Sequence, residues 1–157
     1  MAELRHLHTA WDVDRTIVLD EEHVVAVRFS RHETCADEDD PVAFEHHMLT
    51  AQMDGALAEI ATRVRNFCRI YAVDTNKVPE FNEMFELNDP REPFALLFFF
   101  KNKHIKLDVS TGNNNKVNFV VEPDDLIDMI EVVYRAGDKG RGLATGVKKF
   151  SHMAIAR

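Results

Sequence analysis

The chain has 157 residues with a hydrophobic fraction of 45%, enough for one domain with a real core. Its net charge of −8 at pH 7 argues against a bulk nucleic-acid binder, because such proteins are usually basic overall. No apolar run approaches the ~20 residues that a bilayer requires, and the N-terminus lacks the apolar core of a signal peptide, so we expect a soluble intracellular protein that contacts no membrane.

The first part of the chain predicts two strands around a short helix. We expect a short edge strand over residues 4–11, a helix over 11–20 and a buried strand over 23–30. The core of the second strand is an unbroken run of β-favouring residues, 24–27, which Arg28 and Phe29 end.

A long helix is predicted after an acidic loop. The loop over 31–41 holds a run of acids, and Pro41 behind these acids is a helix-start signal. Gly55 costs on the order of 1 kcal/mol relative to alanine within a helix, so we expect the first half of this helix to be separate or frayed. Apolar residues at spacings of three and four define its core face: Leu49, Met53, Leu57, Ile60, Ala61, Val64 and Phe67.

A strand over 68–74 and a short helix over 79–87 come next. In that helix, Phe81, Met84 and Phe85 are expected to share one apolar side.

A hairpin is predicted at the centre of the sheet. Residues 96–100 are five large apolar residues in a row, so both faces of this strand should be buried. Residues 101–103 predict a tight turn, and 104–110 alternate as in a half-buried strand. The polar, asparagine-rich loop over 111–116 closes the hairpin, and 117–121 predict one more extended segment.

The last predicted helix starts at Glu122 and Pro123, with acids at the positive end of its dipole. We expect Gly137 to end it. Residues 138–157 form a basic, partly irregular tail on an otherwise acidic chain. Charge alone leaves open whether this tail is a contact surface or simply solvated.

This order of elements indicates an α/β fold in one domain over residues 1–157. Parallel strand–helix units lead into an antiparallel hairpin and a final helix, as in a thioredoxin-like fold with a mixed central sheet flanked by helices. Such a topology gives no function by itself.

The thiols do not match a redox site. A thioredoxin-type site needs two cysteines at CxxC spacing at a helix start, where the dipole activates one thiol and the other resolves the mixed disulfide. The corresponding loop offers only Cys35, among acids, which is the opposite of the electropositive surroundings that a reactive thiol requires. Cys68 begins a strand and is interpreted as a small buried apolar residue. We therefore predict no catalytic residue and no cofactor.

The histidines do not predict a metal site either. His46 and His47 are adjacent on a helix and point apart, so they do not form an i, i+4 pair of ligands. His6 and His8 share a strand face, but no acidic or cysteine partner is evident for them.

Polar residues of the hairpin, its loop and the tail are the remaining candidates. Three consecutive asparagines exceed what a turn requires, and they offer adaptable donors and acceptors to a partner's backbone or to RNA. A solvated hairpin and a contact surface both remain open. The candidate partner-binding residues are Lys101, Lys103, His104, Asn113, Asn114, Asn115, Lys116, Lys139 and Arg141.

Four segments of the sequence resemble the Dim-one family, the small thioredoxin-like protein of the U-five small nuclear ribonucleoprotein. They span residues 7–29, 65–90, 98–118 and 130–143. The most specific motifs are NKHI followed by TGNNNK, and KGRG in the tail.

The resemblance implies a thioredoxin fold without redox activity, a nuclear location and a role in pre-mRNA splicing. It implies assembly into the U-five particle and the tri-snRNP, where the large scaffold protein and other tri-snRNP proteins are partners. U-five snRNA or pre-mRNA would lie nearby.

The sequence also departs from that family. Asp89 and Pro90 are followed by Arg91 where the family has a second cysteine, so the cysteine pair of some relatives cannot form with Cys35. Residues 36–50 are interpreted as an acidic insertion. Either Pro90 or Pro93 matches the position of the thioredoxin cis-proline, and the tyrosine-rich C-terminal ending is absent. Two alternatives stay open: a thioredoxin-like redox or thiol-handling protein, and a splicing-related paralogue or adaptor of the same family.

Overall fold

The structure is a computed structural model that describes residues 4–155, so the last two residues of the basic tail lie outside it. Its strands form a six-stranded mixed sheet in the order β1-β3-β2-β4-β5-β6. Strands β1, β3 and β2 run parallel, whereas β4 is antiparallel to both β2 and β5. The strands are β1 Arg5–His6, β2 Val24–Ser30, β3 Cys68–Asp74, β4 Ala95–Phe100, β5 Lys103–Leu107 and β6 Leu143–Ala144.

This arrangement confirms the predicted thioredoxin-like layout, with β4 and β5 as the hairpin. Strand β6, which pairs in parallel with β5, was not predicted, because two residues carry no periodic pattern. Of the extended segment predicted over 117–121, only Val117 pairs with the sheet, through a bridge to Leu96.

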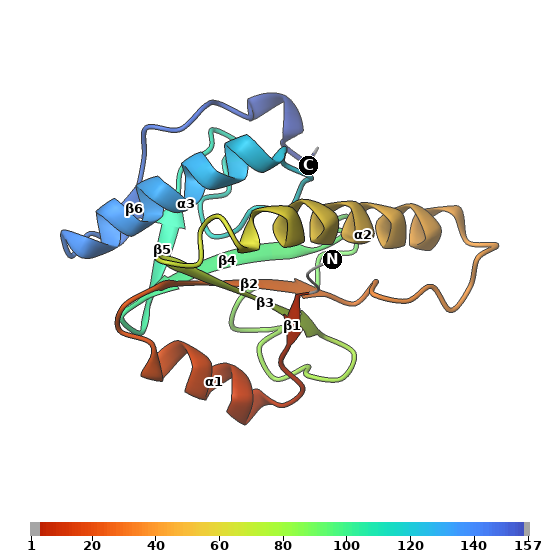
Figure 1. The fold of residues 1–157 in the computed structure, drawn as a ribbon. Helices are drawn as coiled ribbons and strands as arrows, with labels where there is room; N and C mark the ends of the chain where they lie inside the picture. Colours follow the sequence, from red (N-terminus) through yellow and green to blue (C-terminus); the bar gives the residue numbers. More distant parts are fainter. Residues whose placement is uncertain (1–3, 156–157) are drawn as a thin grey trace.

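Helices cover both faces of the sheet (Figure 1). Helices α2 Pro41–Ala61 and α3 Pro123–Asp138 lie on one face, and α1 Ala10–Leu19 lies on the other. The larger core, between the sheet and α2 and α3, includes Met53 and Met129, while the smaller core under α1 includes Val13. A short 3₁₀ turn, Ser151–Met153, follows β6.

Of two local predictions, the structure confirms the buried strand and contradicts the break expected in the long helix. Strand β2, Val24–Ser30, confirms the buried strand predicted over 23–30, and the Arg28 side chain within it is fully buried beside acids. Helix α2 is continuous, and Gly55 lies on its exposed side. The Asp40 carboxylate accepts hydrogen bonds from two N–H groups of the first turn, so residues 41–50 are helical and extend beyond the sheet (Figure 1).

The predicted helix over 79–87 is a series of turns instead. Its backbone hydrogen bonds mix different spacings: Phe85 N donates to Phe81 O, whereas Leu87 N donates to Asn82 O. Glu86 has a positive φ of 56°, which an α-helix does not permit. Phe81 and Phe85 pack under the sheet as expected, but Met84 is 71% exposed, so the apolar side is narrower than predicted.

Helix α3 begins as predicted and ends at Asp138, but the glycine that caps it is Gly140 rather than Gly137. Gly140 has a φ of +76°, its N–H donates to Gly137 O, and Arg141 N donates to Ala136 O. These two bonds are those of a Schellman cap, in which glycine takes the left-handed position. Gly137 has another role, because a Cβ there would lie 2.6 Å from Cδ2 of Phe100.

Gly137→Ala is therefore expected to destabilise the protein by about 1–3 kcal/mol, because the added methyl would lie within 3.0 Å of Cβ, Cγ and Cδ2 of the buried Phe100. Gly55→Ala is the matched control, since a Cβ at Gly55 meets nothing within 4 Å. This control should stabilise the helix by about 1 kcal/mol. Urea unfolding measures both, and equal effects of the two substitutions would contradict the close contact at Phe100.

Candidate docking surface

The turn of the β4–β5 hairpin presents two lysines to solvent. Lys101 and Asn102 have φ values of 50° and 62°, as in the type I′ turns that join tightly paired strands. Lys103 is exposed at the start of β5, and the Lys101 ammonium lies 5.4 Å from the centroid of the Phe100 ring. The predicted turn is thus confirmed, with Lys103 already part of the strand.

The end of α3 and the tail lie beside this turn. Lys106 N donates to Gly142 O at 2.8 Å, and a Cβ at Gly142 would lie 3.2 Å from Cε of Lys103. Lys139 and Arg141, just before Gly142, are exposed.

Four cations from two distant parts of the sequence therefore meet at one end of the sheet. None of them forms an ion pair with any residue among 4–155. We call this group the basic end: Lys101, Lys103, Lys139 and Arg141.

The asparagine loop, residues 111–116, is held mainly by its backbone. Leu107 N donates to Asn114 O at 2.9 Å. The Asn113 side chain accepts from Asn115 N at 3.0 Å, so this side chain shapes the turn. The side-chain amides of Asn114 and Asn115 make no hydrogen bond within the described residues, and they are only partly exposed beside an open cavity of about 370 Å³.

Two of the predicted contact residues are instead part of the framework. Nε2 of His104 donates to Asn115 O at 2.9 Å, and its ring lies against Phe99. Burial lowers the pKa of His104. Lys116 is only 5% exposed, and its ammonium binds the Glu92 carboxylate at 2.7 Å, so it is not available on the surface.

No thiol lies at the start of α2, where a thioredoxin places its reactive cysteine. Asp40 caps that helix, and Cys35 lies in the preceding loop, where its Sγ donates to Asp37 O at 3.4 Å. Cys68 is buried in β3, and burial raises the pKa of its thiol. Of the two proline candidates, Pro93 lies two residues before β4, and its carbonyl accepts from the hydroxyl of Ser30. All peptide bonds between residues 4 and 155 are trans, so neither proline has the cis bond.

A histidine cluster joins the β2–α2 loop to α2. Nδ1 of His46 lies 3.4 Å from Nε2 of His32, and Nδ1 of His47 donates to His32 O. Burial, followed by the charges of His46, Arg31 and His47, lowers the pKa of His32 to about 4. No group of three or more potential metal ligands was found among the described residues.

His32 is expected to make the folded protein less stable as the pH falls from about 6.5 to about 4. In this window the unfolded chain binds a proton that folded His32 does not, so the unfolded state gains stability on acidification. Burial also lowers the pKa of His46, which acts in the same direction. His32→Gln should flatten the decline in unfolding free energy between pH 7 and 4, and an unchanged slope would exclude His32 as its source.

The sequence patterns missed a buried charge network at Arg28. Its Nε and Nη2 bind the two oxygens of Asp54, each at 2.7 Å, and Nη2 also binds Glu33. Glu33 in turn is 3.0 Å from Nε2 of His6, so His6 does have an acidic partner. The only local signal is a charged residue inside an apolar run, which does not reveal its partners.

A sequence model of the family described as mitosis protein DIM1 matches residues 3–150. The chain is 43% identical over 153 residues to spliceosomal protein DIB1 of Eremothecium gossypii, covering 97% of this chain and 96% of that protein. It is 38% identical over 149 residues to mitosis protein dim1 of Schizosaccharomyces pombe, covering 94% of each.

Among solved structures, thioredoxin of Fasciola hepatica superposes with a TM-score of 0.53 at 12% identity, covering 82% of this chain and 97% of that one. A likeness at this identity shows the fold alone. None of the helices in the described part of the chain is long and apolar enough to cross a membrane.

Proposed function

The chain belongs to the family described as mitosis protein DIM1, and on this basis we propose that it is a non-enzymatic component of the spliceosome that acts by docking. The relatives named spliceosomal protein support the splicing role, since the match extends over nearly the whole of both chains. In this role the protein acts in the nucleus, within the U-five small nuclear ribonucleoprotein and the tri-snRNP. Its main partner is the large scaffold protein of that particle, and U-five snRNA or pre-mRNA lies nearby.

The observation that carries the docking proposal is the group of unsatisfied polar side chains around β5. The basic end offers four cations without an ionic partner in the described residues, and the asparagine loop offers free amides at Asn114 and Asn115. Polar side chains of this kind make the binding of a partner specific, because only a partner with complementary charges and hydrogen-bonding groups satisfies them. His104 and Lys116 are not part of this surface. They hold the asparagine loop in place, His104 through Asn115 O and Lys116 through Glu92.

Affinity purification of the tagged full chain from nuclear extract tests this function. We expect the U-five RNA and the large scaffold protein to co-purify, and the absence of both would refute the proposal. Lys101→Glu combined with Arg141→Glu should reduce their recovery, because the substitutions reverse two charges at the basic end.

Asn114→Ala with Asn115→Ala is expected to weaken assembly while leaving the unfolding midpoint nearly unchanged, because their side chains support nothing within the described structure. Asn113→Ala is the matched comparison. It removes the acceptor for Asn115 N and should lower stability as well as binding. Co-purification and thermal unfolding are measured on the same samples, and a loss of stability in the 114/115 variant would show that these side chains are structural.

Redox activity is the rival function, since the thioredoxin-like fold commonly carries it. An insulin-reduction assay with the wild-type chain and Cys35→Ser separates the two functions. We expect no turnover by either protein. Reduction that is abolished by Cys35→Ser would support the rival function.

A further inference from the structure

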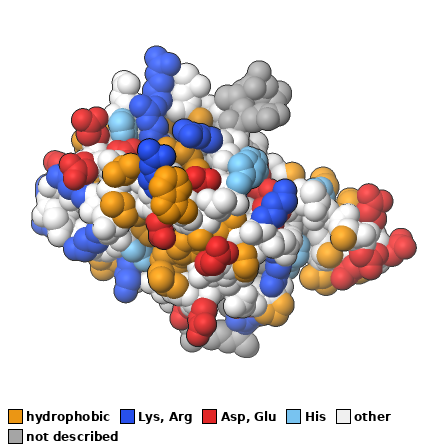
Figure 2. Space-filling view, turned by 90° about the horizontal axis from the view of Figure 1, so that it is seen from below, with side chains coloured by type: hydrophobic (Ala, Val, Ile, Leu, Met, Phe, Trp, Pro, Cys, Tyr) orange, Lys and Arg blue, Asp and Glu red, His pale blue; other side chains and the backbone are white. Residues whose placement is uncertain are grey.

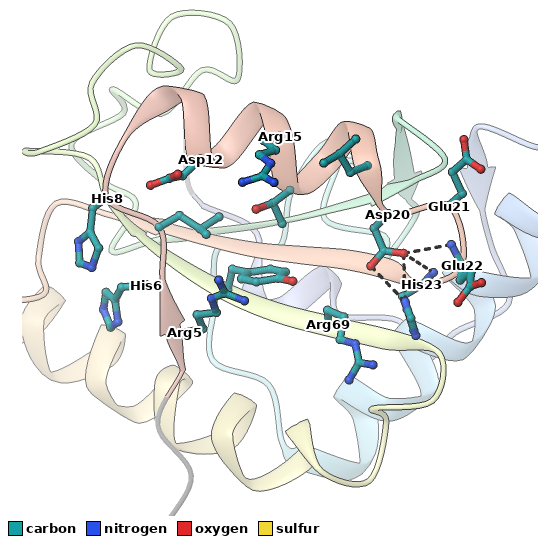
Figure 3. A pocket seen from close by; sticks show the side chains of 14 residues that line it. Arg5, His6, His8, Asp12, Arg15, Asp20, Glu21, Glu22, His23 and Arg69 are labelled. Atoms are coloured by element: carbon teal, nitrogen blue, oxygen red, sulfur yellow. Dashed lines mark hydrogen bonds and ion pairs between the residues drawn. The ribbon is translucent and has the colours of Figure 1, made fainter.

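A groove of about 800 Å³ lies between α1 and the edge of the sheet formed by β1 and β3 (Figure 3). Three arginines from three elements line its middle, Arg5 on β1, Arg69 on β3 and Arg15 on α1, and we call them the guanidinium cluster. All three are exposed, and none forms an ion pair within residues 4–155. The groove therefore holds three arginines whose guanidinium groups remain available to an anion.

An exposed stripe of α1 borders the groove, with Arg15 and Leu19 in its lining and Trp11 next to it. Trp11, Arg15 and Leu19 are spaced by four residues, so they share one face of the helix. Trp11 is 66% exposed and Leu19 65%, and the Arg15 guanidinium lies 5.1 Å from the centroid of the Trp11 ring. Figure 2, seen from the α1 side, shows hydrophobic side chains gathered near the middle of this face with Lys and Arg beside them. Exposed tryptophan next to arginine is the composition of protein-interface hot spots.

Carboxylates line one end of the groove, after α1 (Figure 3). Asp20 is already satisfied, because it accepts from Nδ1 of His23 at 3.0 Å and from two backbone N–H groups. Glu21 and Glu22 are exposed and form no ion pair with any residue that the structure describes. A bound molecule thus meets cations in the middle of the groove, the carboxylates of Glu21 and Glu22 at this end, and Asp12 towards the other end (Figure 3).

We propose that this groove binds an extended segment of a partner protein with a matching charge pattern. An apolar side chain of the segment covers Trp11, a carboxylate lies in the guanidinium cluster, and a lysine or arginine reaches Glu21 and Glu22. A nucleic acid fits this pattern less well, because its evenly spaced phosphates would meet the carboxylates as well as the arginines. The site shares no residue with the basic end or the asparagine loop, so it does not depend on the function proposed above.

Selection from a phage-displayed random dodecapeptide library on the full chain tests this site. The enriched peptides should carry an aromatic or aliphatic residue, a central Asp or Glu, and a Lys or Arg towards one end. The affinity of the synthetic consensus peptide, measured by fluorescence anisotropy, should fall about tenfold or more for Arg69→Glu and for Trp11→Ala. Lys139→Glu is the control. Lys139 lies near β5, far from the β1 edge of the sheet, so this variant should bind the peptide with wild-type affinity.

A charge swap separates recognition from folding. A peptide with its central acid replaced by lysine should bind Arg69→Glu better than it binds the wild-type chain. The proposal is overturned if no peptide is enriched, or if the enriched peptides bind Arg69→Glu and Trp11→Ala as tightly as the wild type. It is also overturned if a single-stranded RNA dodecamer binds the wild-type chain and loses affinity with the same two substitutions.

Discussion

Arg28→Met is expected to lower the free energy of unfolding by about 3 kcal/mol, at the lower end of the range for breaking a buried ion pair. Arg28 is fully buried in β2, and its guanidinium binds the carboxylates of Asp54 and Glu33. Methionine fills much of the same space but leaves both carboxylates without their cation. Because Asp54 is 29% and Glu33 16% exposed at the side chain, water offsets part of the loss.

Two control substitutions test whether the expected loss of stability comes from the buried charge. Arg28→Lys keeps the charge but cannot bind both Asp54 oxygens, so its loss should be intermediate. Arg63→Ala removes an exposed partner of Asp124, 3.7 Å away, and should change stability by less than about 0.5 kcal/mol. Chemical unfolding at neutral pH measures all three, and an Arg28→Met protein as stable as Arg63→Ala would show that the network contributes nothing.

The Arg28 network also fixes the β2–α2 loop to the sheet and to α2, through ion pairs rather than through a disulfide. Glu33 anchors the middle of the loop to β2, and Asp54 anchors the second half of α2 to the same guanidinium. Asp40 then caps α2 where a reactive thiol would be expected. The loop is therefore organised around carboxylates, which is consistent with a structural rather than a redox role for this end of the molecule.

Periodicity predicted the parts of the fold in which local pattern and burial agree. The unbroken run in β4 and the alternation in β5 follow directly from a central and a half-buried strand. Patterns of this kind were sufficient to predict the thioredoxin-like order of strands and helices. Where the pattern was weak or ambiguous, the structure differs: β6 is two residues long, and the turns over 79–87 have an apolar side that resembles that of a helix.

Residues whose role depends on distant partners could not be predicted in this way. Arg28 meets Asp54, 26 positions away in sequence, and a window over β2 contains no trace of that contact. Motif resemblance identified Lys139 and Arg141, but their position near Lys103 comes from the hydrogen bond of Lys106 N to Gly142 O, which no sequence window contains. The guanidinium cluster is a similar case, since its three arginines come from three separate elements.

Lys116→Met is the second substitution with a large expected effect, about 3–5 kcal/mol of lost stability. Lys116 and Glu92 are both buried, with side chains 3% and 6% exposed, and their charged groups are 2.7 Å apart. Asn118 donates a further hydrogen bond to Glu92, and the Lys116 ammonium also donates to Glu86 O. Methionine would leave a buried carboxylate with only the Asn118 amide as a partner in the described structure, which accounts for the size of the loss.

The double variant Lys116→Met with Glu92→Gln distinguishes the cost of an unpaired charge from the cost of a lost contact. A neutral amide at position 92 can still accept from Asn118, so the double variant should be more stable than Lys116→Met alone, although it carries one more substitution. Because Lys116 ends the asparagine loop and Glu92 precedes β4, we also expect the single variant to weaken assembly through that loop. If the double variant is the less stable of the two, the burial of an unpaired Glu92 is not the source of the loss.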